Sequence, residues 1–368
     1  MSPYAHITGW GMAVPARILT NSDLEKIVDT DDEWIQSRTG IRQRHIVSEE
    51  ESTATLAEDA ALNALRVANL NPTDLELIIV STSSPEYLFP ATACLVQDRI
   101  GASHAGAFDL SAACSGFIYA LNMATQAIRS GSVHNALVIG AETLSRFVNW
   151  EDRNTCVLFG DGAGAFVLQA GEEPGGVLSA VMRSDGSGGD LLSLPGGGSR
   201  MPASPETVLQ KQHTIHMNGR EVFRFATRVI AQATREVVAS GHLKMEDVQL
   251  VIPHQANLRI IEAAMRGLEI PIEQCFINIE RYGNTSTASI PIATCEAIQQ
   301  GRLQGGDNIV FVGFGAGLTW GSTLVRWTGP LLPHRHISPA SYRLWVAIRS
   351  RLLRLVRRIE GWIWGRNI

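Results

Sequence analysis

Residues 107–130 read AFDLSAACSGFIYALNMATQAIRS, an extended apolar run that passes into a helical pattern. Apolar residues at steps of three and four predict one buried face of that helix: Phe117, Leu121, Ala124 and Ile128. Cys114 stands where the run ends and the helix begins, among small residues. Backbone N–H groups at a helix start are unpaired and favour a thiolate over a thiol. The position is that of a nucleophile, although a lone cysteine taken by itself more often packs as a small hydrophobe.

The composition predicts a sizeable folded protein with reduced thiols. The chain has 368 residues, 45% of them hydrophobic and 18% charged, which suits two domains or one duplicated domain. Its five cysteines form no CxxC pair and are odd in number, so we expect no disulfide framework, no metal site and a cytoplasmic location. The first residues lack the pattern of a signal peptide, and no run reaches the ~18 apolar residues of a membrane-spanning helix.

Charge is unevenly distributed along the chain. The formal net charge is −5, but residues 331–368 contain eight arginines and one acidic residue, Glu360. That segment contributes +7, so the rest of the chain carries −12. A strongly acidic body argues against broad nucleic-acid binding, and an anionic partner would have to be met by a local basic patch.

Two pairs of similar segments indicate an internal duplication. A buried strand running into a loop is predicted twice, from LELIIVSTS (75–83) and from VQLVIPHQANLRI (248–260). A glycine-rich turn beside an apolar strand also occurs twice, in GDGAGAFVLQA (160–170) and GFGAGLTWGSTLVRW (313–327). Because strands and helices alternate between these segments, we expect an α/β fold built of two similar halves. The glycines do not match a nucleotide-binding fingerprint, which follows a strand and opens a helix.

His254 and Asn284 occupy the same kind of position as Cys114, at the end of an extended run and before a helix. In open α/β folds, such strand ends converge on one crevice. One cysteine, one histidine and one asparagine placed there indicate an acyl-transfer site, with a thiolate nucleophile and two donors for a developing oxyanion. Taken singly, the histidine is more often a satisfied structural residue, and the asparagine is more often a turn or a helix cap.

Six segments follow one another along the chain: DEWIQSRTGIRQRHI, AFDLSAACSGF, CVLFGDGAGA, IPHQANLRI, YGNTSTASIP and GFGAGLTWG. Together they resemble the 3-oxoacyl-(acyl-carrier-protein) synthase III family of thiolase-fold condensing enzymes, from about Ile7 to Trp327. The resemblance implies a thiolase-like, five-layered αβαβα fold and a homodimer. We expect an N-terminal half at 1–175 with the cysteine, a C-terminal half at 176–329 with the histidine and asparagine, and an extension at 330–368.

The resemblance also implies a reaction, the cofactor-free condensation of an acyl-CoA primer with malonyl on the acyl carrier protein, which starts fatty acid synthesis. Cys114 would accept the acyl group, and His254 and Asn284 would stabilise the enolate that remains when malonyl loses CO₂. The backbone N–H groups of Cys114 and Ala316 would hold the oxyanion of the condensation step. Each such donor typically lowers the barrier by ~3 kcal/mol.

Substrate contacts are implied by the same resemblance. CoA and its pantetheine arm would be held by Trp34, Arg38, Thr39, Arg153, Gly219, Asn257 and Arg259. The acyl pocket would be lined by Phe314 and closed by Phe89 of the partner subunit. The acidic carrier protein would meet Arg224, Arg259 and Arg266, with Arg220 and Arg228 on the same helical face as Arg224. That arginine stripe is equally typical of an ordinary solvated face.

Three features depart from the family pattern. Ala316 replaces a glycine, Arg220 replaces an asparagine, and the chain continues for about forty residues beyond Trp327. An alternative is therefore a related acyltransferase or ketosynthase of a specialised-metabolite pathway. A degradative thiolase is disfavoured because the last glycine turn lacks a cysteine. A papain-like cysteine hydrolase, which also uses Cys, His and Asn, and a non-catalytic membrane-associated scaffold fit the sequence less well.

The extension has its own pattern. Between Arg343 and Trp364, apolar residues recur at steps of three and four: Trp345, Ile348, Leu352, Leu355, Ile359 and Trp362. Arginines gather on the other side, which predicts a basic amphipathic helix. Such a helix can lie in a membrane interface, or it can dock its stripe on its own body or on a protein partner. The acidic body favours docking slightly, and in either case the extension should be dispensable for chemistry.

Overall fold

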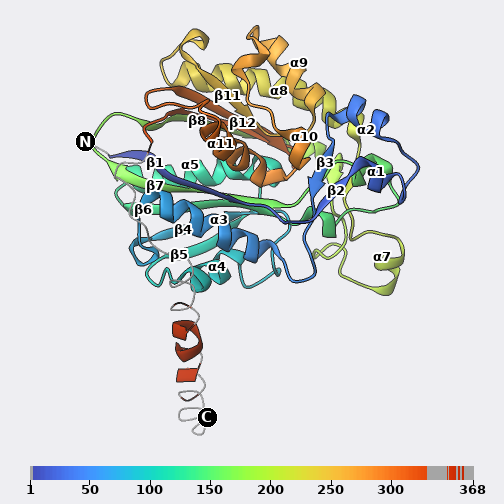
Figure 1. The fold of residues 1–368 in the computed structure, drawn as a ribbon, viewed down its shortest axis with the longest axis horizontal. Helices are drawn as coiled ribbons and strands as arrows, with labels where there is room; N and C mark the ends of the chain where they lie inside the picture. The colour runs from blue at the N-terminus through green and yellow to red at the C-terminus, as the bar shows by residue number, and fades with distance from the viewer. Residues whose placement is uncertain (1–2, 330–345, 347, 354, 357–358, 360–368) are drawn as a thin grey trace.

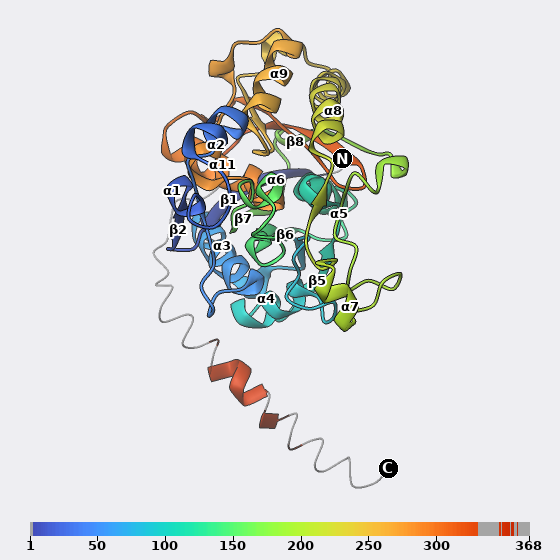
Figure 2. The same cartoon turned by 90° about the vertical axis from the view of Figure 1, so that its right-hand side faces the viewer.

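Two β-sheets face each other across a layer of two helices, and further helices cover their outer surfaces (Figure 1). The computed structural model describes residues 3–329, 346, 348–353, 355–356 and 359. Helices and strands alternate through most of these residues, as the sequence predicts. The resulting order is helix, sheet, helix, sheet and helix, which is the expected five-layered α/β architecture (Figures 1 and 2).

The first sheet is built from the N-terminal part of the chain. Its strand β4 (Leu77–Ser81), with the sequence LIIVS, pairs in parallel with a strand on each side. Such a continuous apolar run is typical of a strand covered on both faces. In spatial order the strands are β1 (Tyr4–Ala13), β7 (Gly162–Gly171), β6 (Asn135–Glu142), β4 and β5 (Gly106–Leu110). Strand β5 forms one edge of this sheet.

The second sheet repeats this arrangement. Its strands, in spatial order, are β8 (Gly176–Ser184), β13 (Thr319–Arg326), β12 (Asn308–Gly315) and β11 (Leu250–Pro253). Strand β13 pairs antiparallel with β8 and β12, and β12 pairs in parallel with β11. An isolated parallel bridge between Val251 and Cys275 lies beside β11, where β5 lies beside β4 in the first sheet. Both sheets therefore have one strand order and one set of strand directions.

The correspondence extends to individual residues of the central strands. Leu77 of β4 pairs with Ala136 of β6 in the first sheet, and Leu250 of β11 pairs with Ile309 of β12 in the second. Each member of the second pair follows its counterpart by 173 residues. The central strands of the two halves therefore correspond residue by residue, with one constant offset.

The two central helices obey the same relation. Helix α5 (Gly116–Arg129) and helix α11 (Ser289–Gln299) begin 173 residues apart. Each follows a short 3-10 turn, Ala113–Ser115 before α5 and Ser286–Ala288 before α11. The duplication predicted from sequence is therefore present in the arrangement of the elements that surround Cys114.

Three apolar clusters hold the five layers together. Between the sheets, Phe117 of α5 contacts Phe166 of β7 edge-on at 5.1 Å between ring centroids, and Phe166 lies 5.8 Å from Phe311 of β12. The outer face of the first sheet packs on α3 (Thr53–Ala68) and α4 (Thr92–Ile100). The outer face of the second packs on α8 (Gly219–Ser240) and α9 (Leu258–Leu268). These contacts set the distance between the strand ends that carry the candidate site.

Shorter elements surround the layered core. They are β2 (Ile18–Thr20), α1 (Asn21–Leu24), α2 (Asp32–Thr39), β3 (Gln43–His45), α6 (Arg153–Cys156), β9 (Leu192–Ser193), α7 (Pro205–Leu209), β10 (His216–Met217) and α10 (Ile279–Tyr282). Helix α1 begins at Asn21, after a capping box between Thr20 and Asp23. The Gly- and Pro-rich segment 183–206 is mostly irregular, although it contributes the short strand β9.

Part of the C-terminal extension is described, and its described residues are helical. This helical segment lies beyond α4 and projects away from the sheets (Figures 1 and 2). The rest of the helix predicted between Arg343 and Trp364 lies outside the described residues. In the part of the chain that the structure describes, no helix is long and apolar enough to cross a membrane.

Candidate active site

Cys114 lies in the 3-10 turn that joins β5 to α5. The preceding residue, Ala113, has a φ of +46°, a left-handed conformation that is uncommon for a residue with a side chain. Backbone strain of this kind clusters at functional sites. Gly315, at the end of β12, lies against the turn, and a Cβ there would stand 2.6 Å from the backbone nitrogen of Cys114. The backbone of β12 therefore approaches the backbone of the cysteine turn so closely that only a glycine fits at position 315.

The thiol of Cys114 is protonated in the unliganded protein. Cys114 is 8% exposed, and burial raises the pKa of its thiol to about 12. The negative charge of buried Glu142 acts in the same direction, while a hydrogen bond from the Ser286 hydroxyl to Sγ (3.3 Å) opposes it. The expected helix-start stabilisation of a thiolate is therefore wrong for this state, because the cost of desolvating the charge outweighs it.

His254 directly follows β11 and is buried. Its Nδ1 lies 2.7 Å from the hydroxyl oxygen of Ser289, which also accepts the backbone N–H of Gln255 at 3.4 Å. Since that oxygen is already an acceptor, we assign its proton to the bond with Nδ1, which leaves the imidazole proton on Nε2. Burial lowers the pKa of His254 to about 3, so the ring is neutral. The buried Nε2 has no protein partner in the described structure and remains a free donor.

Asn284 lies just before the 3-10 turn that precedes α11. Its Oδ1 accepts the backbone N–H of Ser286 at 2.8 Å, so its amide nitrogen is the group that can donate elsewhere. Its backbone is fixed to the first half by a hydrogen bond from its N–H to the Leu158 carbonyl at 2.8 Å. Ser286 has a φ of +48°, matching Ala113 on the counterpart turn. The two strained turns therefore present a thiol from one half and an amide from the other.

A cavity of about 360 Å³ brings Cys114, His254 and Asn284 together on one wall. Six residues predicted to contact substrate also line it: Trp34, Arg38, Thr39, Gly219, Asn257 and Phe314. Phe314 packs edge-on against the His254 ring at 5.5 Å between centroids. The volume of the cavity is in the range of small-molecule sites, and its lining combines apolar residues with a few polar groups. The three polar residues predicted from the sequence to meet at one crevice therefore line one cavity.

Four of the residues predicted to contact CoA, the acyl group or the oxyanion do not line this cavity: Arg153, Arg259, Ala316 and Phe89. The predicted carrier-protein contacts Arg224 and Arg266 do not line it either. Ala316 immediately follows Gly315, which does line the cavity. Phe89 lies on the loop between β4 and α4 and is 86% exposed, beside the equally exposed Leu88. A side chain in that place cannot close the cavity of its own protomer.

The mouth of the cavity combines aromatic and basic groups. The guanidinium of Arg153 lies 5.1 Å from the ring centroid of Trp34, and that of Arg38 lies 5.9 Å from it. Asn257 caps α9 by accepting the N–H of Arg259, and its amide donates to the Arg38 carbonyl at 3.0 Å. These contacts join α2 to α9 at the entrance. Their chemistry suits a planar base and phosphate groups.

Basic side chains continue outward from this entrance. Arg220, at the start of α8, lines the cavity and is exposed. Arg224 pairs with Glu221 on the same helix (3.1 Å), and the Arg259 guanidinium lies 5.7 Å from the ring centroid of Phe223. Arg266 stands in the last turn of α9.

In the described residues no group of three or more His, Cys, Asp or Glu side chains could hold a metal ion.

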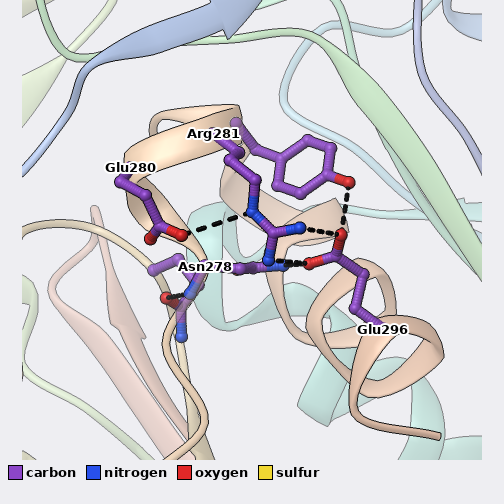
Figure 3. Close-up of polar contacts among 6 residues, drawn as sticks. Asn278, Glu280, Arg281 and Glu296 are labelled. Atoms are coloured by element: carbon purple, nitrogen blue, oxygen red, sulfur yellow. Dashed lines mark hydrogen bonds and ion pairs between the residues drawn. The ribbon is translucent and has the colours of Figure 1, made fainter. Parts of the chain in front are cut away.

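A buried carboxylate holds the loop that carries Asn284 (Figure 3). The Glu296 side chain, on α11, is 8% exposed and accepts two hydrogen bonds from the Arg281 guanidinium, both at 2.8 Å. It also accepts from Asn278 Nδ2 at 2.8 Å and from the Tyr282 hydroxyl at 2.7 Å. We call these four residues the Glu296 cluster. It fixes α10, which ends two residues before Asn284, and the residue preceding α10, Asn278, to the central helix α11.

The same cluster reaches the histidine. The backbone N–H of Asn278 donates to Gln255 Oε1 at 3.0 Å, and Gln255 directly follows His254. Gln255 Nε2 in turn donates to the carbonyls of Pro253 (2.8 Å) and Phe276 (3.1 Å). The loops of both candidate donors are thus tied to one hydrogen-bonded network.

Sequence reasoning missed several residues that shape this site. Ser286 bonds to the thiol, Ser289 sets the histidine tautomer, and Glu296 holds the asparagine loop. The only signal available for the two serines was the run of hydroxyl residues in YGNTSTASIP. That signal is weak, because small hydroxyl residues are common near a helix start for local reasons alone. Glu296 gave no signal, because an acidic residue in a helix is ordinarily exposed.

Two family models match the chain. The model described as 3-oxoacyl-(acyl-carrier-protein) synthase III matches residues 108–186, and the model of its C-terminal part matches residues 238–327. The chain is 53% identical over 328 residues to the beta-ketoacyl-(acyl-carrier-protein) synthase III of Roseiflexus sp. (strain RS-1), covering 89% of this chain and 100% of that relative. It is 50% identical, with the same coverage, to the protein of that name from Clostridioides difficile (strain 630).

Solved structures agree with these matches. The 3-oxoacyl-(acyl-carrier-protein) synthase III of Aquifex aeolicus VF5 is 50% identical, with a TM-score of 0.82 over 88% of this chain and 100% of that one. The priming beta-ketosynthase of the R1128 polyketide pathway is 32% identical, with a TM-score of 0.83 over 89% and 98%. Since 328 residues match the whole Roseiflexus relative and the family model ends at residue 327, about forty residues of this chain lie outside the match.

Proposed function

Because the chain belongs to the 3-oxoacyl-(acyl-carrier-protein) synthase III family and is an acyl-transferring condensing enzyme of fatty acid synthesis, we propose that Cys114, His254 and Asn284 perform its chemistry. The observation that carries the assignment is the single cavity in which a thiol and two N–H donors meet. The fold of two similar halves does not favour a papain-like hydrolase, and an intact set of reactive groups does not favour a scaffold.

The first half-reaction is the transfer of an acyl group from acyl-CoA to Cys114. The sulfur of Cys114 attacks the thioester carbonyl, the bond to the CoA sulfur breaks, and the proton of the Cys114 thiol ends on the released CoA. A thiol with a pKa of about 12 is a weak nucleophile in the unliganded protein. The proton therefore has to leave during the transfer, and the CoA sulfur is its final acceptor.

The second half-reaction begins with malonyl carried by the acyl carrier protein. Loss of CO₂ leaves an enolate, whose oxygen accepts hydrogen bonds from His254 Nε2–H and the amide of Asn284. A neutral imidazole is suited to this task, because it keeps a proton on Nε2 at every working pH. The carbanion then attacks the acyl-Cys114 carbonyl.

The condensation ends with the release of 3-oxoacyl carrier protein. The tetrahedral oxyanion is held by the backbone N–H groups of Cys114 and Ala316, and the carbon–sulfur bond breaks when it collapses. The sulfur of Cys114 takes up one proton and returns to the thiol. Every step uses side chains and backbone of this chain, so we infer that acyl-CoA and malonyl carrier protein act as substrates without a cofactor.

Intact-protein mass spectrometry tests the proposed function directly. The chain is incubated with acetyl-CoA or a longer acyl-CoA, and its mass is measured before and after addition of malonyl carrier protein. An acyl adduct that forms first and disappears with appearance of 3-oxoacyl carrier protein is expected. An adduct that is lost to water at the same rate without malonyl carrier protein would instead indicate a hydrolase.

The proposed substrate contacts follow the cavity outward. Trp34, Arg38 and Arg153 would hold the adenine and phosphates of CoA, and Thr39, Gly219, Asn257 and Arg259 would border the pantetheine arm. Arg224, Arg259 and Arg266 would meet the acidic carrier protein around the same mouth. The support is that Trp34, Arg38, Thr39, Gly219 and Asn257 line the cavity. Arg153 of α6 lies over the Trp34 ring, and the other arginines stand on α8 and α9, whose first residues border the cavity. The five free cysteines are consistent with a reducing, cytoplasmic compartment.

We further infer a homodimer in which each protomer completes the acyl pocket of the other. Exposed apolar side chains surround the edge strand β5 and the adjoining loop: Tyr87, Leu88, Phe89 and Phe108. An open edge strand flanked by exposed apolar residues is a typical pairing surface. In such a dimer Phe89 can reach the partner's cavity, whereas it cannot reach its own.

Replacing Phe89 with alanine is expected to shift the primer preference toward longer or bulkier acyl groups, by about tenfold or more in relative kcat/KM. The acyl-enzyme is weighed across primers from acetyl to octanoyl, and the oligomeric state is followed by sedimentation velocity. Leu88→Ala, at a side chain of similar exposure, is the control and should retain the wild-type preference. An unchanged primer profile in a Phe89→Ala dimer would contradict the placement.

Glu296→Gln is expected to slow malonyl decarboxylation by about tenfold while acylation of Cys114 changes by less than about twofold. The amide keeps the shape of the carboxylate but cannot accept from Arg281, Asn278 and Tyr282 together, so the Asn284 loop loses its fixed geometry. The effect should appear in kcat more than in KM, because a positioning residue acts through Asn284. Rate measurements on pre-acylated enzyme separate the two steps.

Glu280→Gln provides a matched control, since Glu280 pairs with the same arginine but is 38% exposed (Figure 3). Screened surface pairs contribute little, so this variant should decarboxylate within about twofold of wild type. Thermal unfolding of both variants shows whether Glu296→Gln stays folded at the assay temperature. Equal decarboxylation rates in the two folded variants would show that the Glu296 cluster does not position the site.

A ketosynthase of a specialised pathway remains the second candidate, favoured by the similarity to the R1128 priming enzyme. The lower identity, 32% against 53% for the Roseiflexus relative, favours fatty acid synthesis. The two candidates are distinguished by competition between malonyl carrier proteins from the two kinds of pathway for condensation with one acyl-CoA primer. The carrier protein that is condensed preferentially identifies the pathway.

A further inference from the structure

The described residues of the C-terminal extension form a helix with two unlike sides. Val346 and Ser350, four residues apart, lie on the side that faces the body. Val346 is 3% exposed, and the hydroxyl of Ser350 donates to Asp98 Oδ2 on α4 at 2.7 Å. This side of the helix is therefore already occupied by the protein itself.

The other side is apolar and open to solvent. Successive residues of a helix are rotated by about 100°, so four apolar residues fall opposite Val346 and Ser350. They are Ile348 (49% exposed), Leu352 (57%), Leu355 (53%) and Ile359 (48%). We call them the apolar stripe; Val356 widens it on one side. These residues therefore do not dock on the body of their own chain, because α4 contacts the opposite side of the helix. Docking on a protein partner stays a prediction.

Charge surrounds the apolar stripe. Arg349 and Arg351, both described, lie on either side of it around the helix. Over residues 330–368 the sequence has eight arginines, three tryptophans and one acidic residue. An exposed apolar face bordered by arginines and accompanied by tryptophan is the composition of helices that lie in a membrane interface. Among the described residues no helix is long and apolar enough to span a bilayer.

We propose that the extension attaches this enzyme to an anionic phospholipid bilayer by inserting the apolar stripe below the headgroups. A bilayer offers negative headgroups and an apolar interior at the same depth, which matches both arginines and stripe. An acidic protein surface matches only the arginines. The Roseiflexus relative is covered completely without these residues, so attachment is a property added to this chain.

The location of the extension leaves the substrate route open. The described helix of the extension contacts α4 through Ser350, whereas α8 and α9, whose first residues line the cavity mouth, lie at the other end of the molecule (Figures 1 and 2). A bilayer on the α4 side therefore does not cover the entrance. The chain can remain attached while carrier protein and acyl-CoA reach the cysteine from solution.

Vesicle co-sedimentation of the full-length chain tests the proposal. We expect pelleting with vesicles of phosphatidylglycerol and phosphatidylcholine in 0.1 M salt, weak pelleting with phosphatidylcholine alone, and release as salt increases to 0.5 M. The Leu352→Glu/Leu355→Glu variant should partition at least about tenfold more weakly. Leu209→Glu on α7, at a side chain that is 82% exposed, is the control and should pellet like wild type.

Two results would overturn the proposal. One is equal pelleting of the wild type and the double variant on anionic vesicles. The other has two parts: the double variant sediments more slowly than the wild type in the absence of lipid, and the wild type pellets no more with anionic vesicles than without them. That result would assign the stripe to a contact with a second copy of the chain. Acylation by acetyl-CoA in solution is expected to be the same in all these proteins, so failure of the active-site assignment is detected separately.

Discussion

The Cys114→Ala variant is expected to form no acyl-enzyme and to lose condensation activity by about 10⁴-fold or more, the loss typical when a nucleophile is removed. Both half-reactions depend on this sulfur, since it accepts the acyl group and then presents it to the carbanion. Alanine removes the sulfur without adding bulk to a turn that is already strained at Ala113. Intact mass after incubation with acetyl-CoA measures the first effect, and release of 3-oxoacyl carrier protein measures the second.

Cys156→Ala is the matched control, because Cys156 is also a buried free thiol but lies outside the cavity wall. It should acylate like the wild type. An acyl adduct on Cys114→Ala would refute the assignment. Comparison of the two variants also isolates the alkylation of Cys114, which is present in Cys156→Ala and absent in Cys114→Ala. Since the pKa of the Cys114 thiol is about 12, its rate of alkylation by iodoacetamide should rise about tenfold per pH unit between pH 7 and 9. A rate that levels off near pH 7 would mean that the thiolate is already formed.

His254→Ala and Asn284→Ala are expected to retain acylation while malonyl decarboxylation falls by about 10²- to 10³-fold in each, the usual cost of one oxyanion donor. Each variant removes one of two donors that face the enolate but leaves Cys114, Gly315 and the 3-10 turn in place. Carbon dioxide release by pre-acylated enzyme measures the decarboxylation. The acyl adduct on the same sample measures the first step independently.

His213→Ala serves as the histidine control, because His213 bonds to Thr207 outside the cavity wall. It should decarboxylate at the wild-type rate. If His254→Ala or Asn284→Ala also does so, the donor pair has been misassigned. If either variant instead loses acylation, the residue acts on the cysteine, and the separation of the two half-reactions is incorrect.

The layered fold and the convergence of three side chains could be predicted from sequence, because both depend on short-range patterns. The apolar runs of β4 and β11 mark buried strands, and polar residues directly after a strand are delivered to its carboxyl end. His254 follows β11, and Cys114 follows β5, the strand that pairs with β4, which is why their meeting could be anticipated. The family resemblance added the reaction to a placement that the strand ends already indicated.

The electrostatics of the site could not be predicted, because they come from residues distant in sequence. The pKa of Cys114 depends on burial to which Gly315 and Ser286 of the second half contribute. The tautomer of His254 depends on Ser289, thirty-five positions along the chain. A local pattern correctly places a cysteine at a helix start, but it cannot tell whether solvent reaches the sulfur. The expectation of a thiolate failed for this reason.

The extension shows the same limit. Its periodicity predicts an amphipathic helix, and the described residues are helical. Which side docks on the body depends on one hydrogen bond, from Ser350 to Asp98, between residues 252 positions apart. That bond leaves the apolar stripe facing away from the body, whereas the net charge of the acidic body favoured docking of the stripe.

The constant separation of 173 residues between the halves has a consequence for how the protein is made. On a ribosome, the first half is synthesised with its cysteine but without the histidine, the asparagine or the glycine that presses on the cysteine turn. Until the second half has folded onto it, that cysteine belongs to an incomplete fragment with no donors beside it. The grouping of cysteine and donors that condensation requires therefore exists only at the last stage of assembly, and a nascent chain cannot complete the condensation.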